Sequence, residues 1–215
     1  MYDYVSGAVR ISLVTFVLLG FAYPLAITGI AQLFMPSQAN GSVVESADGR
    51  IIGSRLIGQA WDGPQWFHGR PSATVAPDPR DPGKTVEAPY NAANTAASNL
   101  GPTSKPLQER LAADRKALEQ TQPELAGKLL PSDMLTASAS GIDPDITPAN
   151  ALLQVARVAK ARGVPPEQIS ALVEQYVTPR SLWIFGEPRV NVLQLNLALD
   201  RDFPKREASR AEPRP

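Results

Sequence analysis

The sequence predicts a single N-terminal transmembrane helix followed by one soluble domain of mixed α/β (α+β) structure. Three observations predict this fold. Residues 11–35 carry no charged side chain. Residues 42–59 place β-branched and apolar residues on both sides of a glycine-containing turn, as in a β-hairpin. Residues 147–163 begin and end with the signals of an α-helix.

The uncharged residues 11–35 form the predicted transmembrane helix. An α-helix rises about 1.5 Å per residue, so this run is long enough for a hydrocarbon core of about 30 Å. Pro24 removes one backbone donor and predicts a kink, which membrane helices tolerate. The length favours an uncleaved anchor over a signal peptide. Cleavage at Ser37-Gln38-Ala39, which has the small-x-small pattern of a cleavage site, stays an open alternative.

Flanking charge predicts the orientation of this helix. Arg10 lies immediately before it, and the next cation, Arg50, lies beyond its near flank. Positive residues favour the cytoplasmic side. We therefore expect residues 1–10 in the cytoplasm and residues 36–200 as an extracytoplasmic domain.

The first part of the domain is predicted to contain a hairpin and a long loop. Asp48-Gly49 suits the positive φ angles of a tight turn, so residues 42–59 are expected to pair as two strands. Residues 71–89 contain repeated prolines, each of which lacks a backbone donor. We therefore predict an extended surface loop there.

Three helices are predicted after that loop. The first covers about residues 106–120. The second has Thr147 as its N-cap, Pro148 at its first position and Gly163 at its end, and the third follows Pro166. The apolar residues expected to face the core are, in chain order, Leu107, Leu111, Leu118, Leu152, Val155, Ala156, Ala159, Ile169, Leu172, Val173 and Tyr176.

The last ordered segment has two interpretations. Alternate leucines in residues 190–199 fit a strand, whereas Val190, Leu193 and Leu197 fit a helix opened by Pro188. Both remain open. The charged, proline-bearing residues 201–215 are predicted to form a flexible tail.

Composition excludes several classes of function. The chain has 215 residues with 21 basic and 21 acidic side chains, so its formal net charge is zero. This balance lacks the positive footprint of a nucleic-acid-binding protein. Because the chain has no Cys, disulfides, thiolate metal sites and thiol nucleophiles are also excluded.

One motif, Gly83-Lys84-Thr85, is like the end of a phosphate-binding P-loop. A P-loop needs a further glycine five residues before Gly83, but that position is Asp78. We attribute the match to chance.

The single histidine, His68, stands close to Arg70 and Ser72. A Ser–His hydrolase also needs a positioned acid and an oxyanion hole, and its serine commonly lies in a G-x-S-x-G turn, which the chain lacks. A structural or partner-contact role is therefore favoured. A membrane-tethered periplasmic hydrolase is the alternative function.

Acidic residues near the middle of the domain could suggest calcium. Asp143 and Asp145 alternate as calcium ligands do, but no glutamate at the required spacing completes a cage. We interpret this stretch as an ordered turn that leads to the Thr147 cap. Glu187 and Arg189 could form an ion pair or contact a partner. We predict no catalytic residue, no metal site and no cofactor bound with confidence by this chain.

Seven segments that follow the uncharged helix share one resemblance. They are GSRLIGQ (53–59), WFHGRPSA (66–73), PYN (89–91), SNLGP (98–102), LTASASGIDPDITPANA (135–151), QVARVAKARG (154–163) and GEPRVNVLQLNLALD (186–200). In this order they resemble the C subunit of the potassium-transporting Kdp ATPase, the KdpC family. The resemblance spans nearly the whole chain.

The resemblance implies a non-catalytic accessory subunit of a high-affinity, ATP-driven potassium uptake complex in the bacterial inner membrane, needed for assembly and full activity. Its partners would be a channel-like potassium-binding subunit, a catalytic P-type ATPase subunit and a small membrane peptide, which handle K⁺ and ATP. The domain would be periplasmic. The family is also described as a catalytic chaperone that raises the ATP affinity of the P-type subunit. Our candidates for partner contacts are His68, Arg70, Asp143, Glu187 and Arg189.

The chain departs from the family pattern in residues 94–104, NTAASNLGPTS. The family often has paired glycines in this stretch, which was compared with nucleotide-contacting signatures. Here Ala96-Ala97 precede Ser98 and Asn99, and alanine resists the positive φ angles that glycine accepts. The chain also has Ala139 where the family commonly has Gly, and Asp145 where it commonly has His. We interpret residues 94–104 as a structural or subunit-contact loop, in which a nucleotide would meet Ser98, Asn99 and Gly101.

Overall fold

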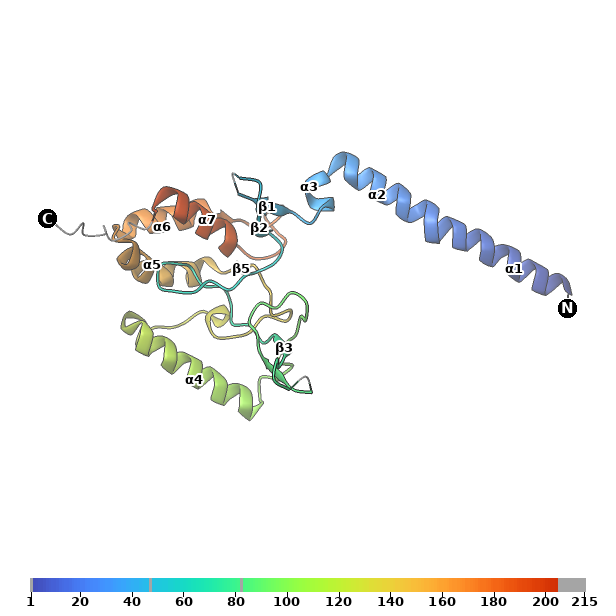
Figure 1. Ribbon diagram of the computed structural model, residues 1–215. Coiled ribbons are helices and arrows are strands. Elements are labelled where there is room, and N and C mark those ends of the chain that lie inside the picture. The colour runs from blue at the N-terminus through green and yellow to red at the C-terminus, as the bar shows by residue number, and fades with distance from the viewer. Residues whose placement is uncertain (1, 47, 82, 205–215) are drawn as a thin grey trace. The chain divides into compact units, whose positions relative to one another are not determined.

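The computed structural model describes residues 2–46, 48–81 and 83–204. The chain divides into two compact units, Met1–Ser54 and Arg55–Pro215. The first holds the apolar helix, one short helix and one hairpin, and the second holds the remaining helices and strands (Figure 1). The predicted fold class, an N-terminal apolar helix followed by an α+β domain, is confirmed.

The N-terminal helix consists of α1 (Tyr2–Val17), a π-helical turn η1 (Leu18–Ala22) and α2 (Tyr23–Phe34). By length and composition, these 33 residues can cross a membrane. The helix begins earlier than the predicted boundary at residue 11, because residues 2–10 continue it. At about 1.5 Å per residue it is longer than a hydrocarbon core of about 30 Å requires.

The π turn lies directly before Pro24, where the sequence predicts a kink. Pro24 has no N–H, and its ring clashes with the preceding turn of a regular α-helix. The N–H of Tyr23 bonds to the carbonyl of Leu18, one residue further back than in an α-helix. The hydroxyl of Thr15 is satisfied within the helix, since it donates to the carbonyl of Ile11 at 2.8 Å.

The first unit ends in the predicted hairpin. After the short helix α3 (Pro36–Ala39), strands β1 (Val43–Glu45) and β2 (Ile51–Ser54) pair antiparallel. Gly49 lies in the turn with φ of 79°. The pairing confirms the hairpin, although its second strand ends at Ser54 and so before the predicted limit.

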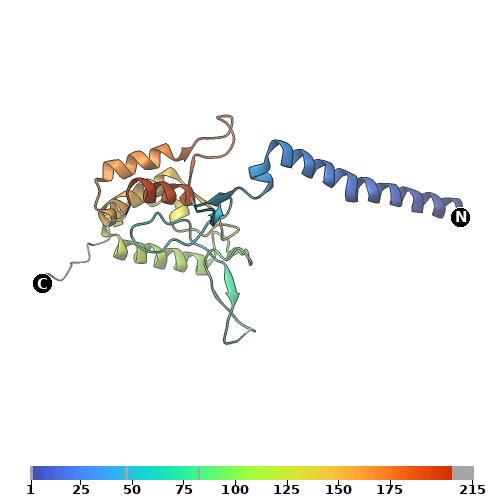
Figure 2. The same ribbon diagram turned by 45° about the horizontal axis from the view of Figure 1, so that its top comes forward.

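The core of the second unit lies between three helices and a small sheet (Figures 1 and 2). The helices are α5 (Pro148–Arg162), α6 (Pro166–Gln175) and α7 (Val192–Asp202). The sheet is antiparallel in the order β5 (Asp145–Ile146), β7 (Arg189–Asn191) and β6 (Val177–Thr178). The largest fully buried apolar side chains of this unit are Phe67, Leu125, Ile169, Leu193, Leu195 and Leu199.

Helix α4 (Lys105–Thr121) confirms the predicted helix at residues 106–120. It lies on the side of this unit opposite α6 (Figures 1 and 2). None of its side chains, all of which are described, is fully buried. α4 therefore covers the domain more loosely than the other three helices do.

The predicted ends of α5 are confirmed. The Thr147 hydroxyl accepts a hydrogen bond from the N–H of Asn150 at 3.1 Å, and Gly163 ends the helix in the left-handed conformation with φ of 67°. The predicted apolar face was partly wrong, because Leu152 and Ala156 are exposed. The buried stripe includes polar Asn150, Gln154 and Arg162 in their place, since these side chains have internal partners.

Residues 190–199 combine both predicted alternatives. β7 ends at Asn191, whose side-chain oxygen accepts a hydrogen bond from the N–H of Gln194 at 3.1 Å and thereby caps α7. Arg201 and Asp202 still belong to α7, so the tail begins later than predicted. Residues 205–215 of the predicted tail lie outside the described residues.

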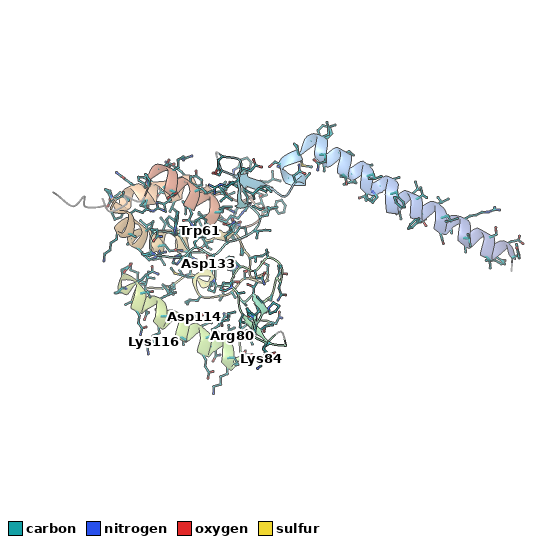
Figure 3. All side chains as sticks on the ribbon, viewed as in Figure 1. Trp61, Arg80, Lys84, Asp114, Lys116 and Asp133 are labelled. Carbon is teal, nitrogen blue, oxygen red and sulfur yellow. The ribbon has the colours of Figure 1, made fainter. Side chains whose placement is uncertain are left out.

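The expected loop at residues 71–89 contains a second hairpin, so the prediction of a wholly extended loop was wrong. β3 (Val75–Pro77) pairs antiparallel with β4 (Thr85–Glu87). Pro77 ends its strand in this two-stranded ribbon, where a missing N–H is tolerated. Arg80 and Lys84 are labelled on this hairpin in Figure 3. Because Thr85 opens a strand, Gly83-Lys84-Thr85 does not open the helix that a P-loop requires.

Candidate functional site

A charged depression of about 300 Å³ lies beside the three-stranded sheet. It contains four of the five predicted partner-contact residues, brought together from three separate parts of the sequence. We call the following set of residues the charged depression: Arg70, Asp133, Asp143, Asp145, Ile146, Thr147, Glu187, Pro188 and Arg189.

Two ion pairs cross the charged depression. Arg70 Nη1 lies 3.1 Å from Asp143 Oδ2, and Arg189 Nε lies 3.1 Å from Asp145 Oδ2. The sheet places the second pair, because Asp145 opens β5 and Arg189 opens β7. The Arg70 and Asp143 side chains are 26% and 29% exposed, so this pair is sheltered but still reachable from solvent.

Arg70 is fixed by more than its carboxylate. Its Nη2 group donates to Thr136 Oγ1 at 3.3 Å and to the carbonyls of Thr136 and Ala137, both at 3.4 Å. Its Nε–H is buried and has no hydrogen-bond partner among the described residues. The guanidinium is therefore held in one orientation while one of its donors remains unused.

The carboxylates of the depression differ in role. Asp133 is buried and accepts from the N–H and hydroxyl of Thr147 at 2.7 and 3.1 Å and from Asn150 Nδ2 at 3.1 Å. It therefore supports the start of α5. Burial raises the pKa of Asp145, although hydrogen bonds from Asn191 and the charge of Arg189 oppose that shift.

The segments that carry the sequence resemblance meet behind the ion pair of Arg70. Tyr90 Oη donates to the carbonyl of Arg70 at 2.7 Å, and burial raises the pKa of Tyr90 to about 12. A Cβ atom at Gly69 would collide with Tyr90 Oη. At Gly58 it would lie 2.5 Å from the carbonyl oxygen of Asp143. Only glycine fits at these two points, because backbone and ring approach too closely for a side chain.

His68 lies in a second depression of about 420 Å³ and not in the charged one. Its ring Nε2 is 2.9 Å from the carbonyl of Gly63. Burial, followed by the nearby charge of Arg157, lowers the pKa of His68. The neighbouring Ser72 hydroxyl donates to the carbonyl of Gly141 at 2.7 Å. The described residues therefore provide no Ser–His hydrogen bond for the hydrolase alternative.

The backbone of Phe67 and His68 is held by amide side chains from two helices. Asn196 on α7 bonds both the N–H and the carbonyl of Phe67, each at 2.9 Å. Gln154 on α5 accepts from the N–H of His68 at 2.8 Å and donates to its carbonyl at 3.0 Å. These bonds satisfy backbone groups that lie outside the helices and strands and so have no partner from regular secondary structure.

Two arginines of α5 hold the residues just before Phe67. Arg157 donates to the carbonyls of Pro64 and Trp66 at 2.7 and 2.9 Å. Arg162 donates to the carbonyl of Gln65 at 3.1 Å and lies 4.4 Å from the centre of the Trp66 ring. We call residues 64–70 the clamped segment. It carries Arg70 to the edge of the charged depression.

The residues named for a nucleotide lie elsewhere. Ser98 and Asn99 are exposed, and in the described part of the chain Ser98, Asn99 and Gly101 line neither depression. The preceding stretch is fixed by the N–H of Ala96, which donates to the carbonyl of Ser140 at 3.2 Å. This geometry supports an ordered surface loop.

Sequence reasoning missed the loop between β6 and β7. Its residues 182–185, which we call the apolar tip, are Leu, Trp, Ile and Phe, and all four are exposed. The signal was present in the sequence as an apolar quartet between Ser181 and Gly186.

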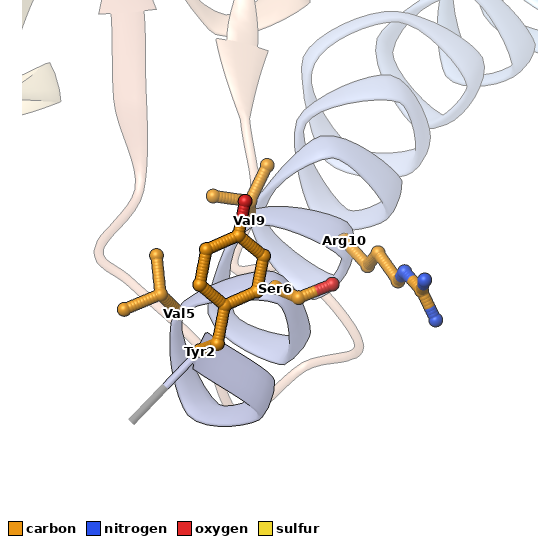
Figure 4. Close-up of a pocket in the computed structure, with 5 residues that line it drawn as sticks. All are labelled: Tyr2, Val5, Ser6, Val9 and Arg10. Carbon is orange, nitrogen blue, oxygen red and sulfur yellow. The ribbon is translucent and has the colours of Figure 1, made fainter.

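The N-terminal helix also presents a shallow apolar face near its start (Figure 4). Tyr2, Val5, Ser6, Val9 and Arg10 line this depression of about 570 Å³. The side chains recur every three or four residues and so share one side of α1. This face suits lipid or another helix and carries none of the predicted site residues.

Comparison with known proteins gives one consistent family. The model of the KdpC family, described as the K⁺-transporting ATPase, c chain, matches residues 5–201. A protein named potassium-transporting ATPase KdpC subunit from Rhodopseudomonas palustris is 58% identical over 186 residues, covering 86% of this chain and 90% of the relative. A protein of the same name from Bradyrhizobium diazoefficiens is 56% identical over 194 residues, covering 90% and 94%. One from Methylobacterium nodulans is 56% identical over 183 residues, covering 85% and 89%.

Proposed function

The chain belongs to the KdpC family, and we propose that it is the accessory C subunit of a potassium-transporting ATPase complex in the bacterial inner membrane. The family match carries this proposal, because it covers residues 5–201 and so includes both the apolar helix and the domain. In the proposal, a channel-like subunit binds potassium, a P-type subunit hydrolyses ATP, and a small membrane peptide completes the complex. This chain contributes to assembly and full activity and is not itself a catalyst.

The proposed anchor is the helix Tyr2–Phe34. Arg10 near its start supports a cytoplasmic N-terminus and a periplasmic domain. Reporters fused after residue 215 test the orientation. We expect an alkaline phosphatase fusion to be active and a fluorescent protein exported through the general secretion route to stay dark. The opposite pattern would place the domain in the cytoplasm.

The charged depression is the proposed contact with the partner subunits. Its six charged side chains comprise two arginines and four carboxylates, a formal balance of 2 − 4 = −2. No group of three potential metal ligands occurs among the described residues. A partner surface with complementary charge therefore suits the depression better than a bound metal does. Such complementarity favours correct pairing of protein surfaces.

The family has also been credited with raising the ATP affinity of the P-type subunit. We propose that any such effect of this chain passes through subunit contacts and not through direct nucleotide binding. The exposed position of Ser98 and Asn99 supports this view, as does the alanine pair that precedes them.

Exchanging the charges of Arg70 and Asp143 tests the contact. We expect Arg70→Asp and Asp143→Arg each to reduce copurification with the partner subunits and growth at low potassium. The double exchange, R70D/D143R, should recover part of the thermal stability, because the ion pair is restored while the bonds from Arg70 to Thr136 and Ala137 are lost, but it should not recover assembly. Full recovery of both thermal stability and assembly would show that the Arg70–Asp143 pair acts only within this chain. The exposed pair Asp81–Lys84 provides the control exchange, D81K/K84D, which should change neither property.

A further inference from the structure

Four consecutive apolar side chains are exposed in the loop between β6 and β7. Leu182 is 74% exposed, Trp183 87%, Ile184 72% and Phe185 63%. Single exposed apolar residues are common on protein surfaces, but a contiguous group with two aromatic rings marks an interaction site. We therefore expect either lipid or a partner protein to cover the apolar tip.

The backbone of the apolar tip is unusual for its residues. Leu182 and Trp183 have φ angles of 51° and 60°. The N–H of Ile184 bonds to the carbonyl of Ser181 at 3.2 Å, which closes a turn around these two residues. Turns with positive φ at both central positions favour Asn-Gly, because L-amino acids with large side chains are strained there. Leu182 and Trp183 therefore occupy the turn against the backbone preference of their residue types. Such conflicts between sequence and local conformation are typical of functional positions.

The base of the loop is held together by paired groups. Ser181 and Phe185 exchange backbone hydrogen bonds at 2.8 and 2.9 Å. Arg180 Nη2 lies 2.6 Å from Glu187 Oε2. The turn is therefore preformed, and the cation beside it already has a partner. What this loop offers is apolar surface and not unpaired charge.

We propose that the apolar tip inserts into the interfacial zone of the bilayer that holds the N-terminal helix. Trp and Phe favour the boundary between headgroups and acyl chains, and exposed Leu and Ile gain from leaving water there. A bilayer is the apolar phase to which the chain is itself attached, because residues 35–54 join the domain to a helix able to cross a membrane. The inference uses only the anchoring part of the proposed function.

Insertion would give the domain a second point of attachment to the membrane. Because the helix already holds the chain at the bilayer, insertion of the tip is an intramolecular event. Even a weak insertion by four side chains then contributes to membrane attachment. Two attachment points also restrict rotation of the domain more than one attachment point does. The tip therefore helps to orient the charged depression toward its partners.

Quenching of tryptophan fluorescence by brominated lipids tests the insertion. The full-length chain is reconstituted into vesicles of phosphatidylethanolamine and phosphatidylglycerol with brominated acyl chains. Trp183 is one of three tryptophans, and the other two, Trp61 and Trp66, are partly buried in the domain. We expect quenching in the wild type that is largely absent in Trp183→Phe, which keeps an apolar tip but removes the reporter. Equal quenching in the two proteins would overturn the proposal.

Two further results would distinguish insertion into the apolar part of the bilayer from binding of the tip to lipid headgroups or to a protein. Because the cation at the base is paired, quenching should not change when phosphatidylglycerol is omitted; dependence on it would indicate headgroup attraction and overturn apolar insertion. If Trp183 stays unquenched in vesicles and is shielded only after assembly with the partner subunits, a protein surface covers the tip and the proposal fails. Carbonate extraction of the same vesicles shows separately whether the chain is anchored, which tests the proposed function.

A variant that restores the preferred turn sequence tests why the tip is strained. In L182N/W183G the turn keeps its backbone and loses its two central apolar side chains. We expect a higher Tm than in the wild type in detergent, together with loss of the Trp183-dependent quenching. A lower Tm would show that Leu182 and Trp183 stabilise the domain, and would overturn the argument that they are retained for insertion.

Discussion

The clamped segment, residues 64–70, and the apolar tip, residues 182–185, are both irregular stretches that carry tryptophan, but their surroundings are opposite. In the clamped segment, four side chains of α5 and α7 bond the backbone from Pro64 to His68. In the apolar tip, the side chains face outward and the turn depends on its own backbone bonds.

This difference separates two uses of a loop. The clamped segment places Arg70 accurately because its polar groups are satisfied by rigid helices. The apolar tip keeps its side chains available because none of the described residues of its own unit covers them. Substitutions in the two regions should therefore act on different properties, stability in the first and association in the second.

The same substitution in both regions should give the largest contrast. Trp66→Ser removes a ring that packs on Arg162 and on Trp61, whose ring centre is 4.9 Å away. We expect a loss of about 3 kcal/mol in the free energy of unfolding, as for other large-to-small changes of packed aromatics. Trp183→Ser should change it by less than about 0.5 kcal/mol. Thermal unfolding of the full chain in detergent measures both, and similar losses would contradict the comparison.

Removing one of the amide side chains of the clamp should have the next largest effect. Gln154→Ala leaves the N–H and carbonyl of His68 without their partners. Unpaired buried groups destabilise a protein by about 1–3 kcal/mol each. Because these two groups are only partly buried, we expect a combined loss in the lower part of the range for two groups, about 2–4 kcal/mol. The control is Gln120→Ala at an exposed position of α4, which should be nearly neutral. A small loss at Gln154 would mean that the segment is held by packing alone.

Arg70→Gln should destabilise the domain more moderately. The Arg70–Asp143 pair is partly exposed, and solvent reduces its contribution, so we expect a loss of about 1–2 kcal/mol. The matched control is Arg50→Gln, whose pair with Asp48 has side chains 83% and 51% exposed. No measurable change is expected there. Equal effects in the two variants would show that Arg70 has no special structural role.

The smallest expected effect concerns the pH dependence of the clamped segment. Burial lowers the pKa of His68 from its ordinary value of 6.5. As the pH falls below that value, the unfolded chain takes up the proton before the folded one does, so stability is lost. We expect the Tm of the wild type to fall more between about pH 7.5 and 5.5 than that of His68→Gln. His68 is the only histidine, so an NMR titration of its ring reads the pKa directly.

Local signals predicted much of the fold. The Thr147 cap, Pro148 and Gly163 define α5 through interactions within a few residues, and they were correctly assigned. The buried face of α5 was not, because Gln154 and Arg162 are buried by partners in residues 65–68, far away in the sequence. Polar residues in a core can be predicted only when their partners are known.

The candidate site shows the same limit. Arg70, Asp143, Glu187 and Arg189 were predicted one by one as partner contacts, but their meeting in one depression depends on how the sheet and the clamped segment are placed. The hairpin in residues 71–89 was missed because its prolines argued against strands. The apolar tip was missed because a short run such as LWIF is also typical of a buried strand.

The π turn before Pro24 has a consequence for the apolar helix itself. A turn closed one residue further back acts as a one-residue insertion, so α2 is out of phase with the pattern that α1 would have continued. A stripe of side chains traced along α1 at regular helical spacing therefore does not continue on the same side of α2. The two halves of the helix can present different faces to their surroundings, and a substitution chosen by spacing in one half has no equivalent at the same spacing in the other.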